Sequence, residues 1–492
     1  DVPSSSDLLH EISAATGDQF ASGNVSYQTL ASFLGRVNYN YDNRYYLTAS
    51  IRSDGSSRFP KGSKFGTFPS VSVAWRLSEE AFMKDTRNWL NNAKVRLGWG
   101  RVGNQAIANG AYMTTLNNGV NYVFGNTPVR FPSTIVGSVG NPNLKWETVE
   151  DIDFGIDLSL FNSKLNVTFD LYQKTSHDML YGKQSLLLLG VPTWQGAITQ
   201  NIGKMRARGW ELAVNYTDQV GDFRYDIGLQ LSGVKNKAIK FTGDGPIWTG
   251  GNQLAESIIK NEDGTEISRF FGYQTAGIFQ NWDQIYNHTD ETGKMIQPDA
   301  QPGDLIFVDR NHDGQLNEAD KTYIGNPYPD LQMGLNMSFW YKNFDLTANF
   351  FGTFGNDIFN LQRRRYSGAG GQNVFRGTLD KTWSESNPDA EYPRLSYNDL
   401  NQNYSRVSDF FVEDGSYFRC KLLTLGYTLP KSITKKFDLR VYASAQNVFT
   451  ITKYSGMDPE RPFYDGGAIE TGIDFNNYPS PRTFLLGLDI KF

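Results

Sequence analysis

Apolar and polar residues alternate along most of the chain. In the last stretch, every second position is apolar: Phe484, Leu486, Leu488, Ile490 and Phe492. The same alternation occupies residues 152–160 and 165–171. A period of two predicts β-strands with one apolar and one polar face. These runs extend over about 9 to 11 residues, the length that a tilted strand needs to cross a bilayer, whereas strands of soluble proteins usually have about 5 or 6 residues.

Thirteen segments carry this pattern and are predicted to be strands: 33–41, 45–52, 68–77, 92–100, 151–161, 164–174, 207–217, 223–233, 331–341, 343–352, 417–428, 437–447 and 482–492. The connections between them alternate between short and long, and the longest are 101–150, 175–206, 234–330, 353–416 and 448–481. Outer-membrane barrels have short periplasmic turns and long extracellular loops. The sequence therefore predicts an all-β fold, a transmembrane antiparallel β-barrel, with those long segments outside the cell.

The strand count is odd, whereas bacterial barrels close with an even number so that no strand edge stays unpaired in lipid. We therefore expect part of the barrel to lie outside this chain. The first strand is expected to run toward the periplasm. Residues 1–32 are accordingly interpreted as the remnant of an extracellular loop, and residues 33–492 as the C-terminal part of the barrel.

Composition narrows the functional classes. The formal net charge is −5, from 47 Lys and Arg against 52 Asp and Glu, which argues against a strongly cationic nucleic-acid binder. Aromatic residues make up 14% of the chain, yet its mean hydropathy is −0.47, and no stretch approaches the roughly 20 apolar residues of a membrane helix. The single cysteine, Cys420, allows no internal disulfide.

Several segments, in order along the chain, resemble the SusC/RagA family of TonB-dependent outer-membrane transporters. The matching segments are 35–41 (GRVNYNY), 46–59 (YLTASIRSDGSSRF), 68–80 (FPSVSVAWRLSEE), 94–100 (KVRLGWG), 103–105 (GNQ), 141–147 (NPNLKWE), 208–211 (RGWE), and 417–419 (YFR) with Leu422. Each segment alone is weakly specific, but their order together is highly specific. The terminal Phe492 also resembles the signal by which outer-membrane barrels are recognised during insertion.

The resemblance implies a 22-stranded barrel with an N-terminal plug, in the outer membrane of a Gram-negative bacterium. It implies import of oligosaccharides or peptides handed over by a SusD-like surface lipoprotein, driven by TonB. This sequence departs from the family pattern because it lacks the plug and the TonB-contacting segment, so contact with TonB is expected only through the missing plug. Transporters of this family are often paired, so a dimer is a further expectation.

The sharpest local motif is the acidic segment 309–320 (DRNHDGQLNEAD). Numbered as a twelve-residue calcium loop, it has oxygen-bearing side chains at positions 1, 3 and 5, a glycine at 6 and a carboxylate at 12. The predicted Ca²⁺ ligands are Asp309, Asn311, Asp313, Gln315 through its carbonyl, and Asp320. The alternative is a solvated turn, since position 12 is Asp rather than Glu and no flanking helices are evident. A bound Ca²⁺ would serve to fold the long extracellular segment.

Catalytic motifs are poorly supported, and we predict no enzymatic activity. The segment 98–103 (GWGRVG) fits G-x-G-x-x-G, but it is followed by a poor helix start and by no acidic residue before Glu147, so a nucleotide site is disfavoured. Histidines are few and scattered, and no G-x-S-x-G or Walker loop occurs. The alternative is a glycoside hydrolase with a pair of catalytic carboxylates, since positions along the sequence do not give the distance between two carboxylates in space.

Tryptophans fall into two groups. Those at the ends of predicted strands suit an aromatic girdle at the membrane interface or packing: Trp75, Trp99, Trp210 and Trp340. Others lie in long loops, where stacking on a ligand and packing within the loop are both open: Trp194, Trp248 and Trp282.

The sequence thus favours the barrel part of a SusC-like importer of oligosaccharides that works with a SusD-like lipoprotein. A RagA-like peptide importer is an alternative, and a plugless passive porin is another. An alternative from a different class is a secreted soluble β-rich glycan-binding protein. That alternative predicts a second sheet that covers the apolar strand faces, whereas a barrel leaves those faces to the lipid.

Overall fold

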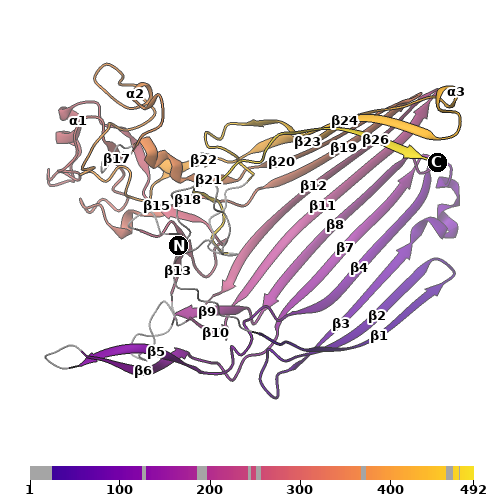
Figure 1. Cartoon of the computed structure of the whole chain (residues 1–492), viewed down its shortest axis with the longest axis horizontal. Helices are drawn as coiled ribbons and strands as arrows, with labels where there is room; N and C mark the ends of the chain where they lie inside the picture. Colours follow the sequence, from indigo (N-terminus) through magenta and orange to yellow (C-terminus); the bar gives the residue numbers. More distant parts are fainter. Residues whose placement is uncertain are drawn as a thin grey trace, which may run out of the picture.

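The computed structural model describes residues 25–124, 129–184, 197–241, 245–250, 256–366, 373–460, 469–475 and 477–492. Thirteen strands form one curved antiparallel sheet, in which the order in space follows the order in the chain (Figure 1). They are β1 (Leu30–Tyr41), β2 (Tyr45–Ser56), β3 (Phe65–Arg76), β4 (Leu90–Asn104), β7 (Glu147–Leu160), β8 (Leu165–His177), β11 (Lys204–Val220), β12 (Phe223–Lys240), β19 (Leu331–Tyr341), β20 (Phe344–Phe354), β23 (Tyr417–Thr428), β24 (Asp438–Thr452) and β26 (Thr483–Lys491). Each of the thirteen predicted strands is confirmed.

Strand lengths differ from the prediction. The strands of the large sheet have between 9 residues in β26 and 18 in β12, and β11 has 17. They are longer because several continue past the membrane-crossing length into segments that we expected to be loops, such as 101–150 and 234–330. Residues 1–24 of the predicted loop remnant lie outside the described residues, and β1 already begins at Leu30.

Most connections are sorted by length to the two ends of the sheet; the exception is 77–89, between β3 and β4, which is longer than 57–64 at the opposite end. The short turns lie at the end that carries the C-terminus, and the long segments gather at the opposite end (Figure 1). Asp42 and Asn43 join β1 to β2 with φ values of 52° and 53°, a left-handed conformation that Asp and Asn tolerate better than most side chains and that suits a tight hairpin. We call the two ends the short-turn end and the long-loop end.

The two faces of the sheet differ in chemistry. In β7, Ile152, Phe154 and Ile156 share one face, and Asp151, Asp153 and Asp157 share the other. The apolar face is uncovered: Phe484, Leu486 and Leu488 of β26 are 74%, 84% and 64% exposed. No second sheet of the described residues packs on it, which contradicts the expectation from a soluble glycan-binding protein.

Aromatic rings border the apolar face at the short-turn end. Tyr41, Tyr45 and Trp75 stack in a row across β1, β2 and β3, with ring centroids 6.4 Å apart at each step. Of the strand-end tryptophans, Trp75 lies in this row, on the apolar face, where an aromatic girdle is expected. Trp340 differs, because the register pairs it on the polar face with Arg224, whose guanidinium lies 4.9 Å from the indole.

Long connections carry small sheets and short helices. The additional strands are β5 (Thr115–Phe124), β6 (Val129–Ser138), β9 (Leu180–Gln184), β10 (Ala197–Asn201), β13 (Ile247–Thr249), β14 (Ile259–Asn261), β15 (Phe270–Gly272), β16 (Thr275–Ile278), β17 (Leu305–Phe307), β18 (Thr322–Gly325), β21 (Asp357–Asn360), β22 (Val412–Asp414) and β25 (Ile473–Asp474). The helices of the long connections are α1 (Trp282–Asn287), α2 (Thr378–Lys381) and the 3₁₀ turns η5 (Glu318–Asp320), η6 (Leu361–Tyr366) and η8 (Asp409–Phe411). Connections at the short-turn end carry α3 (Lys431–Thr434) and the 3₁₀ turns η2 (Leu77–Glu79) and η3 (Ala81–Thr86). Among the described residues, no helix has the length and apolar character needed to span a membrane.

Three of the long connections fold together into one unit, which we call the loop cap: the described parts of 245–330, 355–416 and 453–475. Its core is made of buried side chains from all three: Ile258, Ile259, Phe270, Tyr273, Leu305, Phe307, Phe359, Leu361, Tyr392, Tyr404, Val407, Phe410, Phe411 and Ile473. The three-stranded sheet of β22, β21 and β25 joins two of the connections through backbone hydrogen bonds. The loop cap therefore has a hydrophobic core of its own.

Candidate functional site

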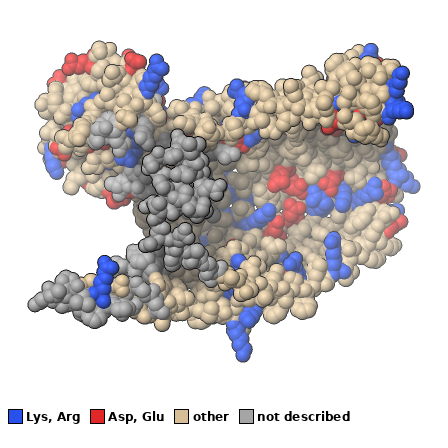
Figure 2. All heavy atoms as spheres, in the orientation of Figure 1, with Lys and Arg blue, Asp and Glu red and all other residues tan. Residues whose placement is uncertain are grey.

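The concave face of the large sheet carries a network of charged side chains (Figure 2). Its centre is Arg96 on β4, whose Nε lies 2.8 Å from Oδ2 of Asp157 and whose Nη2 lies 2.8 Å from Oδ1 of Asp170. Asp153 lies 3.8 Å from the same guanidinium. A Cβ on Gly155 would lie 2.4 Å from the Asp170 carboxylate and 2.5 Å from Arg96, so the crossing of these side chains requires glycine there. One cation thus links three strands.

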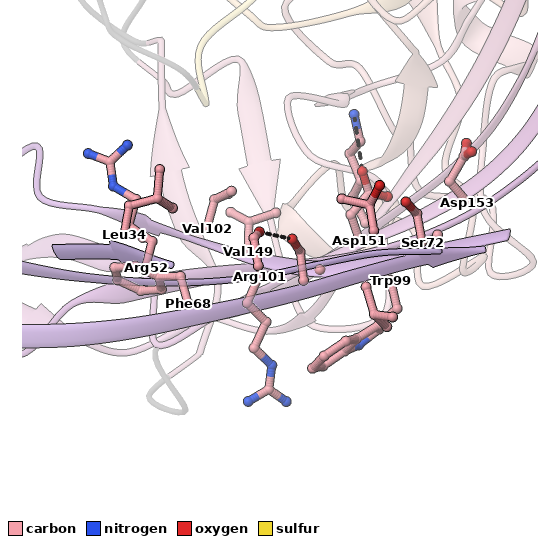
Figure 3. A pocket seen from close by; sticks show the side chains of 18 of the residues that line it. Leu34, Arg52, Phe68, Ser72, Trp99, Arg101, Val102, Val149, Asp151 and Asp153 are labelled. Atoms are coloured by element: carbon pink, nitrogen blue, oxygen red, sulfur yellow. Dashed lines mark hydrogen bonds and ion pairs between the residues drawn. The ribbon is translucent and has the colours of Figure 1, made fainter. Parts of the chain in front are cut away.

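A hollow of about 760 Å³ lies along the concave face of β2, β3, β4 and β7 (Figure 3). Asp151 and Ser72 point into it, and Lys174 lies 4.0 Å from the Asp151 carboxylate at its edge. Trp99 and Arg101 point to the opposite face of the sheet (Figure 3). A wall of carboxylates, hydroxyls and cations is suited to polar solutes that pass along it.

The loop cap encloses buried polar groups that tie its segments together. Asp304 is fully buried and accepts hydrogen bonds from Nε of Arg394 at 2.7 Å and from Nδ2 of Asn403 at 3.0 Å. Asp399 accepts from the backbone N–H groups of Asn403 and Tyr404 at 2.8 and 3.0 Å, and its burial raises the pKa of its carboxyl above the ordinary range. These contacts fix the segment around β17 against residues 394–404.

The outer surface of the loop cap exposes an aromatic pair. Trp282 and Tyr286 of α1 are 49% and 59% exposed, and their rings stack with centroids 6.0 Å apart. Trp248 is 42% exposed and packs edge-on against Phe271 at 5.6 Å. Trp194 lies outside the described residues. Trp282 and Tyr286 therefore form a platform on which a planar or ring-shaped ligand can stack.

The acidic segment 309–320 is a tightly hydrogen-bonded turn that follows β17. Asp309 is buried, and its Oδ2 accepts the Gly314 N–H at 2.8 Å, whereas its Oδ1 is buried without a hydrogen-bond partner. Gly314 has φ of 78°, and a Cβ there would meet the Asp290 carboxylate at 2.4 Å. A glycine is thus required at the sixth position for both conformation and space.

The other predicted ligands take part in hydrogen bonds within the turn, around the carboxylates of Asp313 and Asp320. Asn311 and Asn317 donate to Oδ2 of Asp313 at 2.9 and 3.3 Å, and the Asn311 bond holds the pKa of the Asp313 carboxyl below its usual range. Asp320 is 1% exposed and accepts backbone N–H groups of Arg310 and Asn317 with its two oxygens, closing a capping box. The backbone N–H of Gln315 donates a hydrogen bond to Oδ1 of Asp313 at 2.9 Å.

The described residues contain no group of three or more His, Cys, Asp or Glu side chains arranged to hold a metal ion. In the acidic segment, the carboxylates of Asp309, Asp313 and Asp320 accept hydrogen bonds from backbone N–H groups of the turn itself. The segment 98–103 lies within β4 and continues as a strand through Asn104, so it does not form the turn and helix of a dinucleotide site.

The concave charged residues were not singled out by the sequence analysis as a functional set. The available signal was the placement of Asp151, Asp153 and Asp157 at alternate positions opposite Ile152, Phe154 and Ile156. That pattern places the carboxylates on one face, but the strand register across β4, β7 and β8 is needed to bring Arg96 among them.

Comparisons with known proteins agree with this architecture. Residues 5–448 match the family described as TonB dependent receptor-like, beta-barrel. The chain is 33% identical to TonB-dependent receptor P3 of Formosa agariphila and 34% identical to TonB-dependent receptor SusC of Bacteroides thetaiotaomicron, in each case over 94% of this chain and 45% and 44% of the relative. The chain therefore spans about half the length of the curated relatives that it matches.

A solved structure of the RagAB peptide transporter has the same fold, with a TM-score of 0.77 at 23% identity over 99% of this chain and 50% of that chain. The resemblance to the SusC/RagA family is thereby confirmed. The sheet has its strands in chain order, with an apolar outer face and a charged inner face, and both the matched family and the relatives agree with that architecture. This chain therefore belongs to the TonB-dependent receptor family, as part of a β-barrel of the SusC/RagA kind.

Proposed function

We propose that this chain forms the C-terminal barrel portion of a SusC-like TonB-dependent importer in the outer membrane of a Gram-negative bacterium. The observation that carries the proposal is the large antiparallel sheet with an apolar face outside, a charged face inside and the longest connections at one end. In this proposal the long-loop end faces the exterior and the short-turn end faces the periplasm.

The proposed division of labour follows from the two regions. The barrel wall bounds the path, and its concave network around Arg96 keeps that path polar. The loop cap and its neighbours receive the substrate and the partner at the mouth of the barrel. A plug outside this chain would move when TonB pulls on it and so open the path. The chain itself performs no catalysis in this scheme, in keeping with a family of transporters.

We propose a SusD-like surface lipoprotein as the partner and oligosaccharides as the substrate. The SusC relative supports the partner, and the exposed Trp282 and Tyr286 pair supports a sugar because pyranose rings stack on aromatic faces. Import of peptides is the second candidate, favoured by the shared fold with the RagAB peptide transporter.

The two substrates can be distinguished on the full-length protein, extracted in detergent from outer membranes and analysed by mass spectrometry for co-purified ligands. An oligosaccharide importer is expected to yield a series of masses spaced by a sugar unit, together with a lipoprotein partner. A set of peptide masses would overturn the oligosaccharide assignment and retain the importer. Extraction of the protein without detergent, or uptake that persists in cells lacking TonB, would overturn the importer.

We further propose that the acidic segment binds Ca²⁺ as a structural ion, through Asp309, Asn311, Asp313, the Gln315 carbonyl and Asp320. The supporting observation is the buried Oδ1 of Asp309, because a buried carboxylate oxygen without a hydrogen-bond partner is costly and a cation would satisfy it. Ca²⁺ prefers such oxygen ligands, and neighbouring amide and carbonyl oxygens supplement the few carboxylates. When bound, the ion would neutralise the acidic turn and hold it against the rest of the loop cap.

The calcium proposal is tested by thermal melting of the full-length protein with excess Ca²⁺ or with a chelator. We expect Ca²⁺ to raise the melting temperature of the loop cap and Asp309→Asn to abolish that shift, because the variant loses the carboxylate at the first position. Asp283→Asn, on α1, is the matched control and should respond as the wild type does. An equal melting temperature with Ca²⁺ and chelator would overturn the proposal.

A further inference from the structure

Four cations cluster on the apolar-side surface of the sheet, at the long-loop ends of β11 and β12. The strand register pairs Arg208 with Lys235 and Arg206 with Lys237. Arg208, Lys235 and Lys237 are exposed, and Arg206 is half-buried. We call these four residues the basic cluster.

The alternation along β11 shows which face the basic cluster occupies. Glu211 pairs with Asp170, a member of the concave network, so odd-numbered positions of β11 in this stretch face the interior. Arg206 and Arg208 have the opposite parity and share their face with Trp210 and Leu212. The basic cluster therefore lies on the outside of the barrel, in line with the surface that meets lipid.

The position of the basic cluster along the barrel axis can be estimated from its distance to Trp210. This indole lies against Gly233, where a Cβ would come within 2.7 Å of its Nε1. Arg208 and Arg206 are two and four residues beyond Trp210, or about 7 and 14 Å along the strand at about 3.4 Å per residue. With a strand tilt of about 45°, they stand about 5 and 10 Å above the aromatic ring. With Trp210 at the membrane interface, as the proposed function implies, that is the level of the lipid headgroups.

Charge in the basic cluster is only partly compensated. Lys235 pairs with Asp330, and Nε of Arg208 donates to Oε1 of Gln173 at 2.7 Å. No carboxylate of the described residues forms an ion pair with Arg206 or Lys237. A hollow of about 270 Å³ lies among the four cations, with Glu266 as the acidic residue on its wall. The basic cluster thus leaves room and positive charge for an anion.

We propose that the basic cluster binds the phosphate groups of a phosphorylated glycolipid headgroup, as in the lipid A of the outer leaflet. This inference rests on the proposed function, which puts the long-loop end outside. Cations placed just beyond an interfacial tryptophan such as Trp210 are favourably positioned for anionic headgroups. The arginine guanidinium matches phosphate oxygens through paired N–H donors, and the apolar surface below Trp210 can contact the acyl chains of the same lipid.

The test measures lipid retention by the full-length protein in detergent, using native mass spectrometry. The probes are bisphosphorylated lipid A, the same lipid without its phosphates, and phosphatidylethanolamine, with inorganic phosphate as a competitor. The variant is Arg206→Gln with Lys237→Gln, chosen because neither side chain has an ion-pair partner among the described residues. The matched control is Lys435→Gln with Lys436→Gln, which removes two cations at the short-turn end.

We expect the wild type and the control to retain bisphosphorylated lipid A in preference to the other two lipids. The variant should bind it roughly thirtyfold more weakly, as expected for two lost headgroup contacts. Equal retention of the two forms of lipid A, or equal binding by variant and wild type, would overturn the proposal. Complete displacement by millimolar inorganic phosphate would reassign the basic cluster to a soluble anion. Extraction in detergent and TonB-dependent uptake test the importer separately, so they can succeed where this proposal fails.

Discussion

The large sheet and the loop cap differ in where they keep their apolar side chains. In the sheet, large apolar residues face outward and stay exposed, as Leu486 does at 84%. In the loop cap they turn inward, and Phe359, Phe307 and Phe411 are completely buried. The largest fully buried side chains of the described residues all lie outside the thirteen strands: Tyr392, Tyr404, Phe59, Phe270, Phe279, Phe307, Phe359, Phe411, Leu144, Ile258, Ile259 and Ile285.

The difference reflects two solvents. In the sheet, pairing between strands satisfies the backbone hydrogen-bonding groups. Its apolar side chains face lipid, whose hydrocarbon chains are as apolar as a protein core. The loop cap folds in water and must bury apolar area to be stable. The same chain therefore contains a region held mainly by hydrogen-bonded ladders and a region held mainly by side-chain burial.

The largest expected effect comes from the buried ion pair of the loop cap. Arg394→Ala would leave the fully buried Asp304 carboxylate without its cation, at a cost of about 3–5 kcal/mol in the unfolding free energy of the loop cap. Hydrogen exchange of residues 297–308 should accelerate, while that of β7 and β8 stays slow. The control is Lys431→Ala, which breaks an exposed pair with Asp438. Equal protection of residues 297–308 in both variants would contradict the prediction.

A core truncation should separate the two regions directly. Phe359→Ala removes a buried ring that packs on Phe270 and Phe411, and we expect it to destabilise the loop cap by about 3–5 kcal/mol. Leu488→Ala, on the lipid-facing side of β26, should cost less because it leaves no enclosed cavity. The two variants can be compared by limited proteolysis of the loops and by heat-induced unfolding of the barrel. A larger effect of Leu488→Ala would mean that the proposed outer face is packed.

A smaller effect is expected for the packing of Phe68, on β3, against Trp146 in the connection between β4 and β7. Gly103 lies against Phe68, and a Cβ there would come within 2.1 Å of the ring. Gly103→Ala should displace Phe68 from its contact with Trp146 and cost about 1–3 kcal/mol. On the same strand, Gly98→Ala has its nearest neighbour at 3.9 Å and should be tolerated. Indole fluorescence of Trp146 is the readout, and equal spectra for the two variants would count against this packing.

The smallest effect is expected from the concave network. Arg96→Met removes the cation between Asp153, Asp157 and Asp170, and we expect a loss of about 1–2 kcal/mol because the network is partly hydrated. High salt should reduce the loss by screening the remaining carboxylates. Arg101→Met, on the same strand and the opposite face, is the control with one partner, Glu150. The temperature of barrel unfolding, measured at low and high salt, checks the difference.

Sequence reasoning was most successful for the strands of the sheet. The period of two, the run lengths and the alternation of short and long connections are local properties, so β19 and β23 were predicted with their observed bounds. It was less successful for the long connections, where the described parts of 234–330 contain six short strands and an α-helix. Those elements have three to six residues and are stabilised by contacts between distant segments, which no local pattern reveals.

The sequence by itself determined the class of fold, the two chemically different faces of each strand, and the family, because these depend on spacing along one chain. The tertiary structure decided which charges meet. Arg96 reaches three carboxylates only through the register of three strands, and the basic cluster forms only because β11 and β12 pair Arg208 with Lys235. Register is fixed by the fit of whole strands and turns, so these sites arise from relations between segments that alternation within one segment does not contain.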